Sequence, residues 1–369
     1  MKILCLIDSL TFGGAQTQMA NIACDLKDYG HQVTLVTYYK GGDYDSRFNK
    51  RDLRVICLEK RSRFSILPIL KLRSLIKAYD FDIALAFLYT PSLYLELACI
   101  GLKKPKLVVS ERSVISNGRK TLLLSFFAAM HCFADAVTTN NNTHYRWLLT
   151  NFSWLKAKLH LIRNSVSLEY FSPLVKEEKH KPLDELCFLS VARVQPEKNA
   201  ITLVKALETC IKKFNMRVTI MWAGEVVDKD YYSKCCNLLK DLGIEKYWHW
   251  LGVRNDVSHL MKHSDALIAP SLFEGHPNAI CEALASGLPI LASNVCDIPQ
   301  LVRPGLTGFL FAPESSADIA SKIVEFANLT NDQRRSLANN CRDYALENLS
   351  SEKCSLAYQN LFRKLISSQ

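Results

Sequence analysis

Short apolar runs alternate with helical stretches along the first half of the chain. The runs are rich in branched and aromatic residues, as buried strands are, and they alternate with segments whose apolar residues recur at helical spacing. Strand after helix after strand predicts a parallel, doubly wound sheet. The predicted strands of this half span residues 2–8, 32–38, 54–58, 83–88, 107–110, 136–139 and 159–162.

The same alternation begins again after residues 173–186, a charged segment with prolines and no periodicity, which we interpret as a linker. A chain of 369 residues exceeds what one core usually supports, so we expect two α/β domains, at 1–172 and 187–349. Residues 350–369 place apolar side chains at roughly helical intervals, which predicts a final amphipathic helix. The predicted strands of the second domain span residues 187–192, 217–223, 248–251, 266–269, 289–292 and 308–311.

Composition narrows the class of protein. With 49% hydrophobic and 22% charged residues the chain is typical of a soluble globular protein. The first apolar run is too short for a secretory signal, and the longest, residues 122–134, falls short of the ~20 residues that span a bilayer. Thirteen scattered cysteines without a Cys-x-x-Cys pair indicate reduced core thiols rather than a zinc site or a disulfide framework. We therefore expect a cytoplasmic protein.

Charge is distributed unevenly between the halves. Residues 1–175 hold 23 Lys and Arg against 13 Asp and Glu, whereas residues 176–369 hold 23 of each. Two stretches that combine basic and apolar residues, 60–77 and 119–130, suit the surface of an anionic membrane. The alternative is that the first is a solvated crossover connection and the second a buried core helix. No zinc-finger spacing, recognition helix or RNP-type string is visible, so no nucleic-acid partner is expected.

Two glutamates give residues 271–290 the strongest chemical signal. Pro277 suits the first position of a helix and Gly287 the residue just past its end, which predicts a helix over 277–286. Glu274 then precedes the helix and Glu282 lies more than one turn inside it. Free N–H groups at the helix start, with Gly275 allowing close approach, could hold a diphosphate between the two acids. Ordinary acids favoured by the helix dipole are the alternative.

Two cations follow the first strand of the second domain. Ligands of open parallel sheets bind at the carboxyl ends of the strands, where Arg193 and Lys198 are placed. Arg193 can grip a phosphate with two hydrogen bonds, and Lys198 adds a flexible point charge. Together they could neutralise a departing diphosphate, whereas solvated loop cations are the alternative.

The first domain lacks the signature of a dinucleotide site. Its first turn carries Gly13 and Gly14 but no Gly-x-Gly-x-x-Gly, and its second strand ends without an acid, which weakens an oxidoreductase interpretation. The two glycines could still approach a phosphate or simply make a tight turn. Two Asp-x-Asp strings, 43–45 and 228–230, lie in charged loops, and we predict no metal site from them.

The second half resembles that of the retaining GT-B glycosyltransferases of glycosyltransferase family 4, also called "glycosyl transferases group 1", which include many bacterial glycan-assembly enzymes. Gly13–Gly14 and residues 164–173 extend the resemblance to the first half. His276 and the serines at 165 and 167 depart from the common pattern. The matching segments are residues 191–198, 251–253, 264–266, 270–278, 282–289 and 305–310.

The resemblance implies a role for individual residues. Arg193 and Lys198 would bind the donor diphosphate, Glu282 the ribose hydroxyls, and Glu274 would face the transferred sugar. His276 could contact sugar hydroxyls or simply pack as a neutral ring. Gly14 is assigned to the donor and Gly13 to the acceptor. The backbone that would close around sugar and phosphate comprises Gly275, His276, Pro277, Asn278 and Ala279.

The segment Ser110-Glu-Arg-Ser113 occupies the place where many relatives have a functional histidine near the acceptor. Glu111 and Arg112 are therefore candidates for the cleft between the domains, with an ordinary surface ion pair as the alternative.

The implied protein has two Rossmann-like domains facing across a cleft, with the last helix packing back toward the first domain. It would transfer a hexose or N-acetylhexosamine from a nucleotide sugar, with a UDP-sugar favoured, to a glycan or lipid-linked acceptor at the inner face of the cell membrane. The family generally retains the anomeric configuration and needs no metal or other cofactor. A sugar-nucleotide epimerase, a phosphorylase and a non-catalytic binding subunit are the alternatives.

Overall fold

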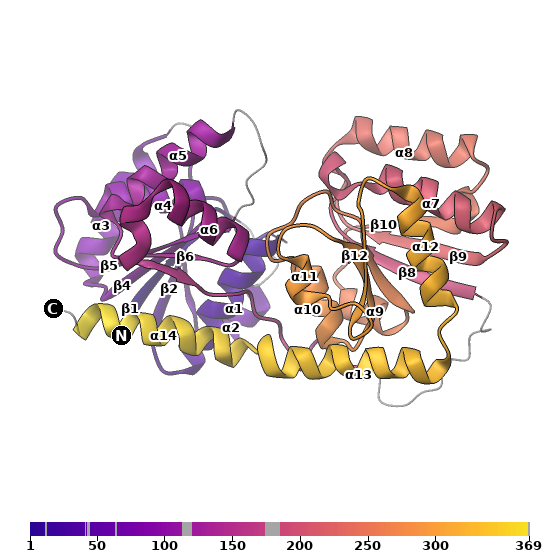
Figure 1. Ribbon diagram of the computed structural model, residues 1–369. Helices are drawn as coiled ribbons and strands as arrows, with labels where there is room; N and C mark the ends of the chain where they lie inside the picture. Colours follow the sequence, from indigo (N-terminus) through magenta and orange to yellow (C-terminus); the bar gives the residue numbers. More distant parts are fainter. Residues whose placement is uncertain are drawn as a thin grey trace. The chain divides into compact units, whose positions relative to one another are not determined.

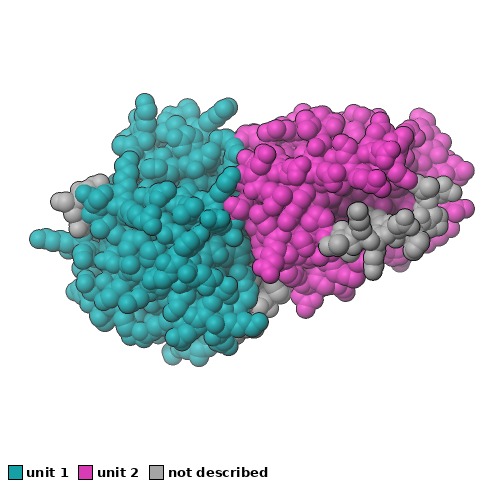
Figure 2. Space-filling model, turned by 90° about the horizontal axis from the view of Figure 1, so that it is seen from below, with its two compact units in different colours: residues 1–165, 351–369 teal, residues 166–350 magenta. Residues whose placement is uncertain are grey.

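Two compact units make up the chain in a computed structural model, which describes residues 1–11, 13–40, 42, 45–62, 65–112, 120–173 and 185–367. Unit 1 comprises residues 1–165 and 351–369, and unit 2 residues 166–350 (Figure 1, Figure 2). The division at 165 precedes the boundary expected at 172. Most of the expected linker, residues 174–184, lies outside the described residues.

Unit 1 is built on a seven-stranded sheet in the order β3-β2-β1-β4-β5-β6-β7, in which every pair of neighbours is parallel. All the strands predicted for this half form, because each is an apolar run with a buried place in the sheet. Their bounds are β1 Lys2–Leu6, β2 Gln32–Thr37, β3 Arg54–Cys57, β4 Ile83–Phe87, β5 Lys106–Glu111, β6 Ala136–Thr139 and β7 Leu159–Leu161.

Helices cover both faces of this sheet, as an all-parallel sheet requires. They are α1 Gly14–Asp28, α2 Asp45–Asn49, α3 Leu67–Tyr79, α4 Tyr89–Cys99, α5 Lys120–Met130, α6 Asn142–Asn151 and α14 Ser351–Ser367, with 3-10 turns η1 at His131–Phe133 and η2 at Ser153–Ala157.

Successive residues of β1 point to opposite faces and enter two separate cores. Ile3 belongs to the core that includes α1 and α14, and Leu4 to the core that includes α3 and α4. Tyr358 and Phe362 of α14 are fully buried in the first of these cores. The expected packing of the last helix against the N-terminal half is thus confirmed.

Unit 2 repeats the arrangement with a six-stranded parallel sheet in the order β10-β9-β8-β11-β12-β13, and the six predicted strands all form. Phe188 of β8 joins the core under α7, α8 and α12, and Leu189 the core under α9, α10 and α13. The strands are β8 Glu185–Val191, β9 Arg217–Ala223, β10 Trp248–Gly252, β11 Ala266–Ala269, β12 Ile290–Ser293 and β13 Gly308–Phe311. The helices are α7 Ala200–Lys212, α8 Lys229–Asp241, α9 Val257–Lys262, α10 Asn278–Ala285, α11 Ile298–Leu301, α12 Ser316–Ala327 and α13 Asn331–Asn348, with 3-10 turns η3 at Pro196–Lys198 and η4 at Glu245–Tyr247.

Each sheet has one place where the strand order reverses direction. In unit 1 it lies between β1 and β4, and in unit 2 between β8 and β11. The loops after two such neighbouring strands leave the sheet at the same edge and diverge, so a crevice opens there. The candidate sites lie at these two places.

Candidate active site

The loops that follow β8 and β11 are tied together at the reversal point of unit 2. The backbone N–H of Leu272 donates to the carbonyl oxygen of Glu197 across 2.9 Å. Asn199 is buried and uses its side-chain amide to donate to the carbonyl oxygens of Pro270 and Pro313, at 3.0 and 2.7 Å. One side chain therefore joins the segments after β8, β11 and β13.

The start of the loop that carries Arg193 is fixed by the neighbouring strand β9. The indole N–H of Trp222 donates to the carbonyl oxygen of Ala192 at 2.8 Å, and the N–H of Val194 to that of Glu225 at 2.7 Å. Gly224 lies against this loop so closely that a Cβ there would come within 2.0 Å of the Ala192 oxygen. A larger residue would push the Arg193 loop away from the sheet.

Lys198 and Glu274 form an ion pair across the two loops. Each side chain is less than one-fifth exposed, at 17% and 18%. The hydroxyl of Ser271 donates to the same carboxylate oxygen at 2.9 Å. Arg193, by contrast, is exposed, and within the described part of the chain it makes no ion pair. The structure thus pairs Lys198 with Glu274 and leaves Arg193 exposed on the same loop.

The helix after this loop begins one residue later than expected. Pro277 is extended, with φ −70° and ψ 120°, and precedes α10 as its cap because its carbonyl accepts the N–H of Cys281. Asn278 and Ala279 are the first two helical residues, both half-buried. Gly287 has the left-handed φ of 65° that was expected of the residue just past the helix end.

Gly275 and His276 are buried at the start of this helix. The Nδ1 atom of His276 lies 3.4 Å from the thiol of Cys281, so the ring contacts the helix it precedes. That contact favours a packing role for the imidazole over a direct contact with sugar.

Glu282 lies in α10 with part of its side chain covered. Burial raises the pKa of its carboxyl to about 7. The pKa of Tyr170 is raised by burial and then by the charges of Asp256 and Glu282. A carboxyl with a pKa near 7 can be present in either protonation state when a ligand hydroxyl meets it.

In unit 1 the two glycines of the first turn open α1. Gly13 is the extended residue before the helix, and its carbonyl accepts both the N–H and the hydroxyl of Thr17, at 2.8 and 2.9 Å. Gly14 is the first helical residue. The arrangement makes a tight turn with helical N–H groups at the carboxyl edge of β1.

Glu111 is buried in the interior of unit 1, where each of its carboxylate oxygens accepts from a histidine. His131 donates through Nε2 to Glu111 at 2.6 Å and through Nδ1 to Glu96 at 2.8 Å, and His144 bonds the other Glu111 oxygen. Burial alone would raise the pKa of Glu111, but the two histidines outweigh it and lower that pKa to about 2. Direct contact with an acceptor would require these bonds to break, so we now treat Glu111 as a structural residue.

Arg112 is also engaged within unit 1. Its guanidinium donates to Ser110 Oγ, Asn164 Oδ1 and the hydroxyl of Tyr358, at 3.1, 2.9 and 3.1 Å, and lies 3.5 Å from the centroid of the Phe87 ring. The arginine therefore joins β4, β5 and α14. Ser113 lies outside the described residues.

Candidate metal ligands do not gather in the part of the chain that the structure describes, where no three His, Cys, Asp or Glu side chains form such a group. Asp228 caps α8 instead, accepting the N–H of Tyr231 at 2.9 Å. The other string, at 43–45, lies mostly outside the described residues. None of the described helices has the length and apolarity needed to cross a membrane.

Comparison with known proteins identifies the family. The sequence profile of "Glycosyl transferases group 1" matches residues 172–345, and that of "Glycosyltransferase Family 4" matches residues 12–170. The chain belongs to the group 1, family 4 glycosyltransferases. Its fold is accordingly GT-B.

Relatives of this glycosyltransferase include an Escherichia coli UDP-Gal:alpha-D-GlcNAc-diphosphoundecaprenol alpha-1,3-galactosyltransferase, 32% identical over 50% of this chain and 49% of that protein. The match thus spans about half of the Escherichia coli enzyme. A Campylobacter jejuni alpha-1,4-N-acetyl-D-galactosaminyltransferase that acts on GalNAc-alpha-(1->4)-GalNAc-alpha-(1->3)-diNAcBac-PP-undecaprenol is 24% identical over 95% of this chain and 97% of its own length.

Solved structures agree with this glycosyltransferase in fold. A glycosyltransferase from Rickettsia africae ESF-5 superposes with a TM-score of 0.85 at 21% identity, over 100% of this chain and 99% of that one. Anabaena Alr3699/HepE in complex with UDP and glucose gives 0.84 at 19% identity, over 98% and 99%.

Several site residues of this glycosyltransferase were not predicted from its sequence. Asn199 and Ser271 hold the loops and the Glu274 carboxylate, and Gly224 supports the Arg193 loop. An asparagine directly before a helix is a signal for Asn199, since asparagine tolerates the left-handed φ of 59° observed there. Nothing in the spacing of His131 and His144 marks them as partners of Glu111.

Proposed function

We propose that this glycosyltransferase transfers a hexose or N-acetylhexosamine from a UDP-sugar to a hydroxyl of a lipid-linked glycan, with retention of the anomeric configuration. The observation that carries the proposal is the gathering of Lys198, Glu274 and Ser271 at the strand reversal of unit 2. Relatives named for undecaprenyl-diphosphate acceptors support the class of acceptor.

Each side chain has a proposed part in this reaction. Glu282 would accept hydrogen bonds from the ribose hydroxyls once its carboxyl, whose pKa is about 7, is ionised. Arg193, which is exposed and makes no ion pair in the described chain, would meet the diphosphate. Lys198 would move from Glu274 to the phosphate nearest the sugar, leaving Glu274 to face the sugar itself.

In the proposed step the bond between the anomeric carbon and the phosphate oxygen breaks as the acceptor oxygen bonds to that carbon from the same face. The acceptor's proton passes to the departing phosphate oxygen. Arg193 and Lys198 would stabilise the negative charge that develops there, which is the work of a metal ion in other transferases. We therefore propose that the reaction needs no metal.

Unit 1 is proposed to dock on an anionic membrane at the inner face of the cell. Ile66 and Leu70 are 69% and 56% exposed at the start of α3, and Phe126 of α5 is 53% exposed. Lys71 and Lys77 lie on the same helix as Leu70, and the excess of positive charge falls in this half of the chain. Apolar side chains beside cations are what an interfacial surface requires.

Product analysis would test the proposal. The protein would be incubated with UDP- and GDP-sugars and a sugar linked to a short polyprenyl diphosphate, with and without EDTA, and the anomeric configuration read by NMR. We expect retention of configuration and no effect of EDTA. Inversion would overturn the mechanism, an isomerised sugar nucleotide without acceptor would favour an epimerase, and no salt-sensitive sedimentation with anionic vesicles would overturn membrane docking.

A further inference from the structure

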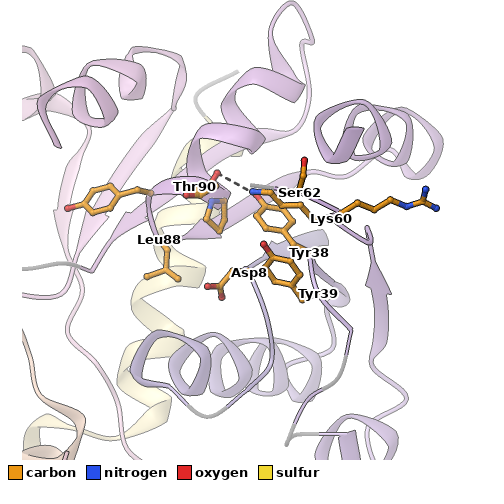
Figure 3. Close-up of a pocket in the computed structure, with 10 residues that line it drawn as sticks. Asp8, Tyr38, Tyr39, Lys60, Ser62, Leu88 and Thr90 are labelled. Carbon is orange, nitrogen blue, oxygen red and sulfur yellow. Dashed lines mark hydrogen bonds between the residues drawn. The ribbon is translucent and has the colours of Figure 1, made fainter. Parts of the chain in front are cut away.

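A second reversal of strand order, in unit 1, holds a cavity of about 490 Å³ at the carboxyl ends of the strands (Figure 3). The segments after β1, β2, β3 and β4 all contribute to it. Its lining comprises Asp8, Tyr38, Tyr39, Lys60, Arg61, Ser62, Leu88, Tyr89, Thr90 and Pro91.

This place in a doubly wound sheet is where small ligands bind. The glycine fingerprint of a dinucleotide is missing after β1, and β2 leads into Tyr38 and Tyr39 rather than a ribose-binding acid. Three tyrosine rings, two cations and a carboxylate line the cavity instead. The chemistry of the cavity therefore differs from that of a nucleotide site.

Lys60 supplies the cavity with a fixed positive charge. Its ammonium lies 4.7 Å from the ring centroid of Tyr94 and 5.5 Å from that of Tyr38. The backbone N–H of Lys60 donates to the Tyr38 carbonyl at 2.9 Å, which fixes the start of the side chain. The rings orient the ammonium without neutralising it. In the described chain Lys60 makes no ion pair, whereas the nearby Lys40 is paired with Glu59. An oriented ammonium that no carboxylate of the described chain pairs with is suited to binding an anion.

Asp8 supplies an acceptor for hydroxyl groups. Its Oδ1 accepts from the N–H of Ser9 at 2.7 Å and from the side chain of Gln16 at 2.9 Å, which fixes the carboxylate. Tyr39 is 47% exposed beside it and offers an aromatic face on which a sugar ring could lie. Figure 3 shows Asp8 between Leu88 and Tyr39, with Lys60 near Thr90.

Leu88 lines the same cavity in a backbone conformation that leucine rarely adopts, with φ 75° and ψ 156°. It is held there because its N–H donates to the Ser110 carbonyl at 3.1 Å and its own carbonyl accepts the N–H of Ser92 at 3.0 Å. Strained backbone of this kind gathers at binding sites, where the surrounding structure fixes it. The strain is a further sign that the cavity is shaped for a ligand.

We propose that this cavity binds a sugar phosphate, the phosphate-bearing sugar of the acceptor, with the phosphate at Lys60 and sugar hydroxyls at Asp8. Arg61, exposed at the rim, adds a second cation for the phosphate. The identification of the ligand as acceptor rests on the proposed function, whereas the binding of a sugar phosphate does not. The two cations would then meet the phosphate, and the Asp8 carboxylate would meet the sugar hydroxyls.

Calorimetry on the full chain with N-acetylglucosamine 1-phosphate as the probe would test the cavity directly. Lys60→Met should weaken binding at least about tenfold, since a hydrogen bond to a charged group is worth that much. Lys60→Arg should restore most of the affinity. Lys50→Met, which removes an exposed lysine just ahead of β3, at the opposite edge of the sheet, is the matched control and should bind as the wild type does.

Free N-acetylglucosamine and inorganic phosphate, used as separate probes, test the binding of the sugar half and of the phosphate half of the ligand. Both should bind more weakly than the sugar phosphate, and Asp8→Asn should affect the two sugars but not inorganic phosphate. Equal affinity for inorganic phosphate and the sugar phosphate would overturn the proposal, as would wild-type binding by Lys60→Met.

Kinetics with a polyprenyl-diphosphate sugar distinguish this proposal from the proposed function. Lys60→Met should raise the acceptor KM at least about tenfold and leave the donor KM unchanged. Transfer with an unaltered acceptor KM would overturn the cavity assignment and leave the function standing. Loss of sugar-phosphate binding in Lys60→Met, in a protein that transfers nothing, would support the cavity and overturn the function.

Discussion

Lys198 and Glu274 form an ion pair although they stand 76 positions apart in the sequence. The pair joins the loops after β8 and β11 and is held from one side by the hydroxyl of Ser271. Each charge is therefore balanced before either side chain acts. A phosphate that draws Lys198 away would leave the Glu274 carboxylate free for a sugar.

Removing the Glu274 carboxylate should therefore affect turnover more than binding. We predict that Glu274→Ala lowers kcat by about 100-fold or more, because stabilisation near the reacting centre is lost, while the donor KM changes much less. Steady-state kinetics with a varied UDP-sugar measures both. Glu314→Ala, at an exposed acid after β13 on the same sheet edge, is the control. A wild-type kcat in Glu274→Ala would remove the assignment.

Donor binding should depend on pH through Glu282. Ribose hydroxyls donate best to an ionised carboxylate, so affinity should rise as pH increases through about 7, the pKa of this carboxyl. Calorimetric titration of UDP at pH 6, 7 and 8 would measure the rise. Glu282→Gln should bind more weakly at pH 8 and show a flat profile, and a rise of the same size in that variant would assign the effect to another group.

The same carboxyl should lower the stability of the protein at alkaline pH. Because its folded pKa of about 7 exceeds the ordinary value of 4.5, its contribution is most favourable below 4.5 and is lost as pH rises through 7. Glu282→Gln should therefore melt at a higher temperature than the wild type at pH 8. Its free energy of unfolding should exceed that of the wild type by at most about 3 kcal/mol. Equal melting temperatures at pH 8 would contradict this.

Asn199→Ala should loosen the three loops that Asn199 joins. The buried Pro270 carbonyl would lose its donor at about 1–3 kcal/mol, the partly buried Pro313 carbonyl at less, and alanine adds strain at a φ of 59°. Asn215→Ala is a matched control, because Asn215 is exposed with a similar φ of 50° and makes no such bridge in the described chain. Thermal melting of both variants isolates the bridge, and equal losses would show that it contributes nothing.

The buried His131 should make unit 1 less stable as pH rises. Burial would lower its pKa, but bonds to Glu111 and Glu96 raise it to about 9, above the ordinary 6.5. Its contribution is complete below 6.5 and is lost as pH rises to about 9. Melting temperatures from pH 6 to 9.5 should fall more steeply for the wild type than for His131→Gln. His249→Gln, at an exposed histidine of unit 2, should follow the wild type, and parallel curves for all three would contradict the prediction.

The strands and the helix after Glu274 could be predicted because each depends on local sequence. Apolar runs gave every predicted strand a place in a sheet, and Gly287 marked the end of α10. The start of α10 was misplaced by one residue because proline fits both the cap and the first turn. Local sequence thus predicts the type of an element more accurately than the residue at which the element begins.

Contacts between residues that are far apart in the sequence could not be predicted from local sequence patterns. Sequence reasoning placed Lys198 and Glu274 on one edge but did not predict that they pair with each other. The family resemblance placed Glu111 near an acceptor, in a segment where many relatives have a functional histidine, whereas two histidines from η1 and α6 enclose it. Which side chains meet across a fold depends on packing that one sequence does not display.

Unit 1 is assembled from both ends of the chain, whereas unit 2 is a continuous segment. Because α14 follows unit 2 along the chain, unit 1 lacks Tyr358 and Phe362 until α14 has been synthesised. A nascent chain that ends within unit 2 would therefore expose one face of the first sheet. Loss of the last helix through a late stop codon would leave the N-terminal half, rather than the tail, exposed to proteolysis.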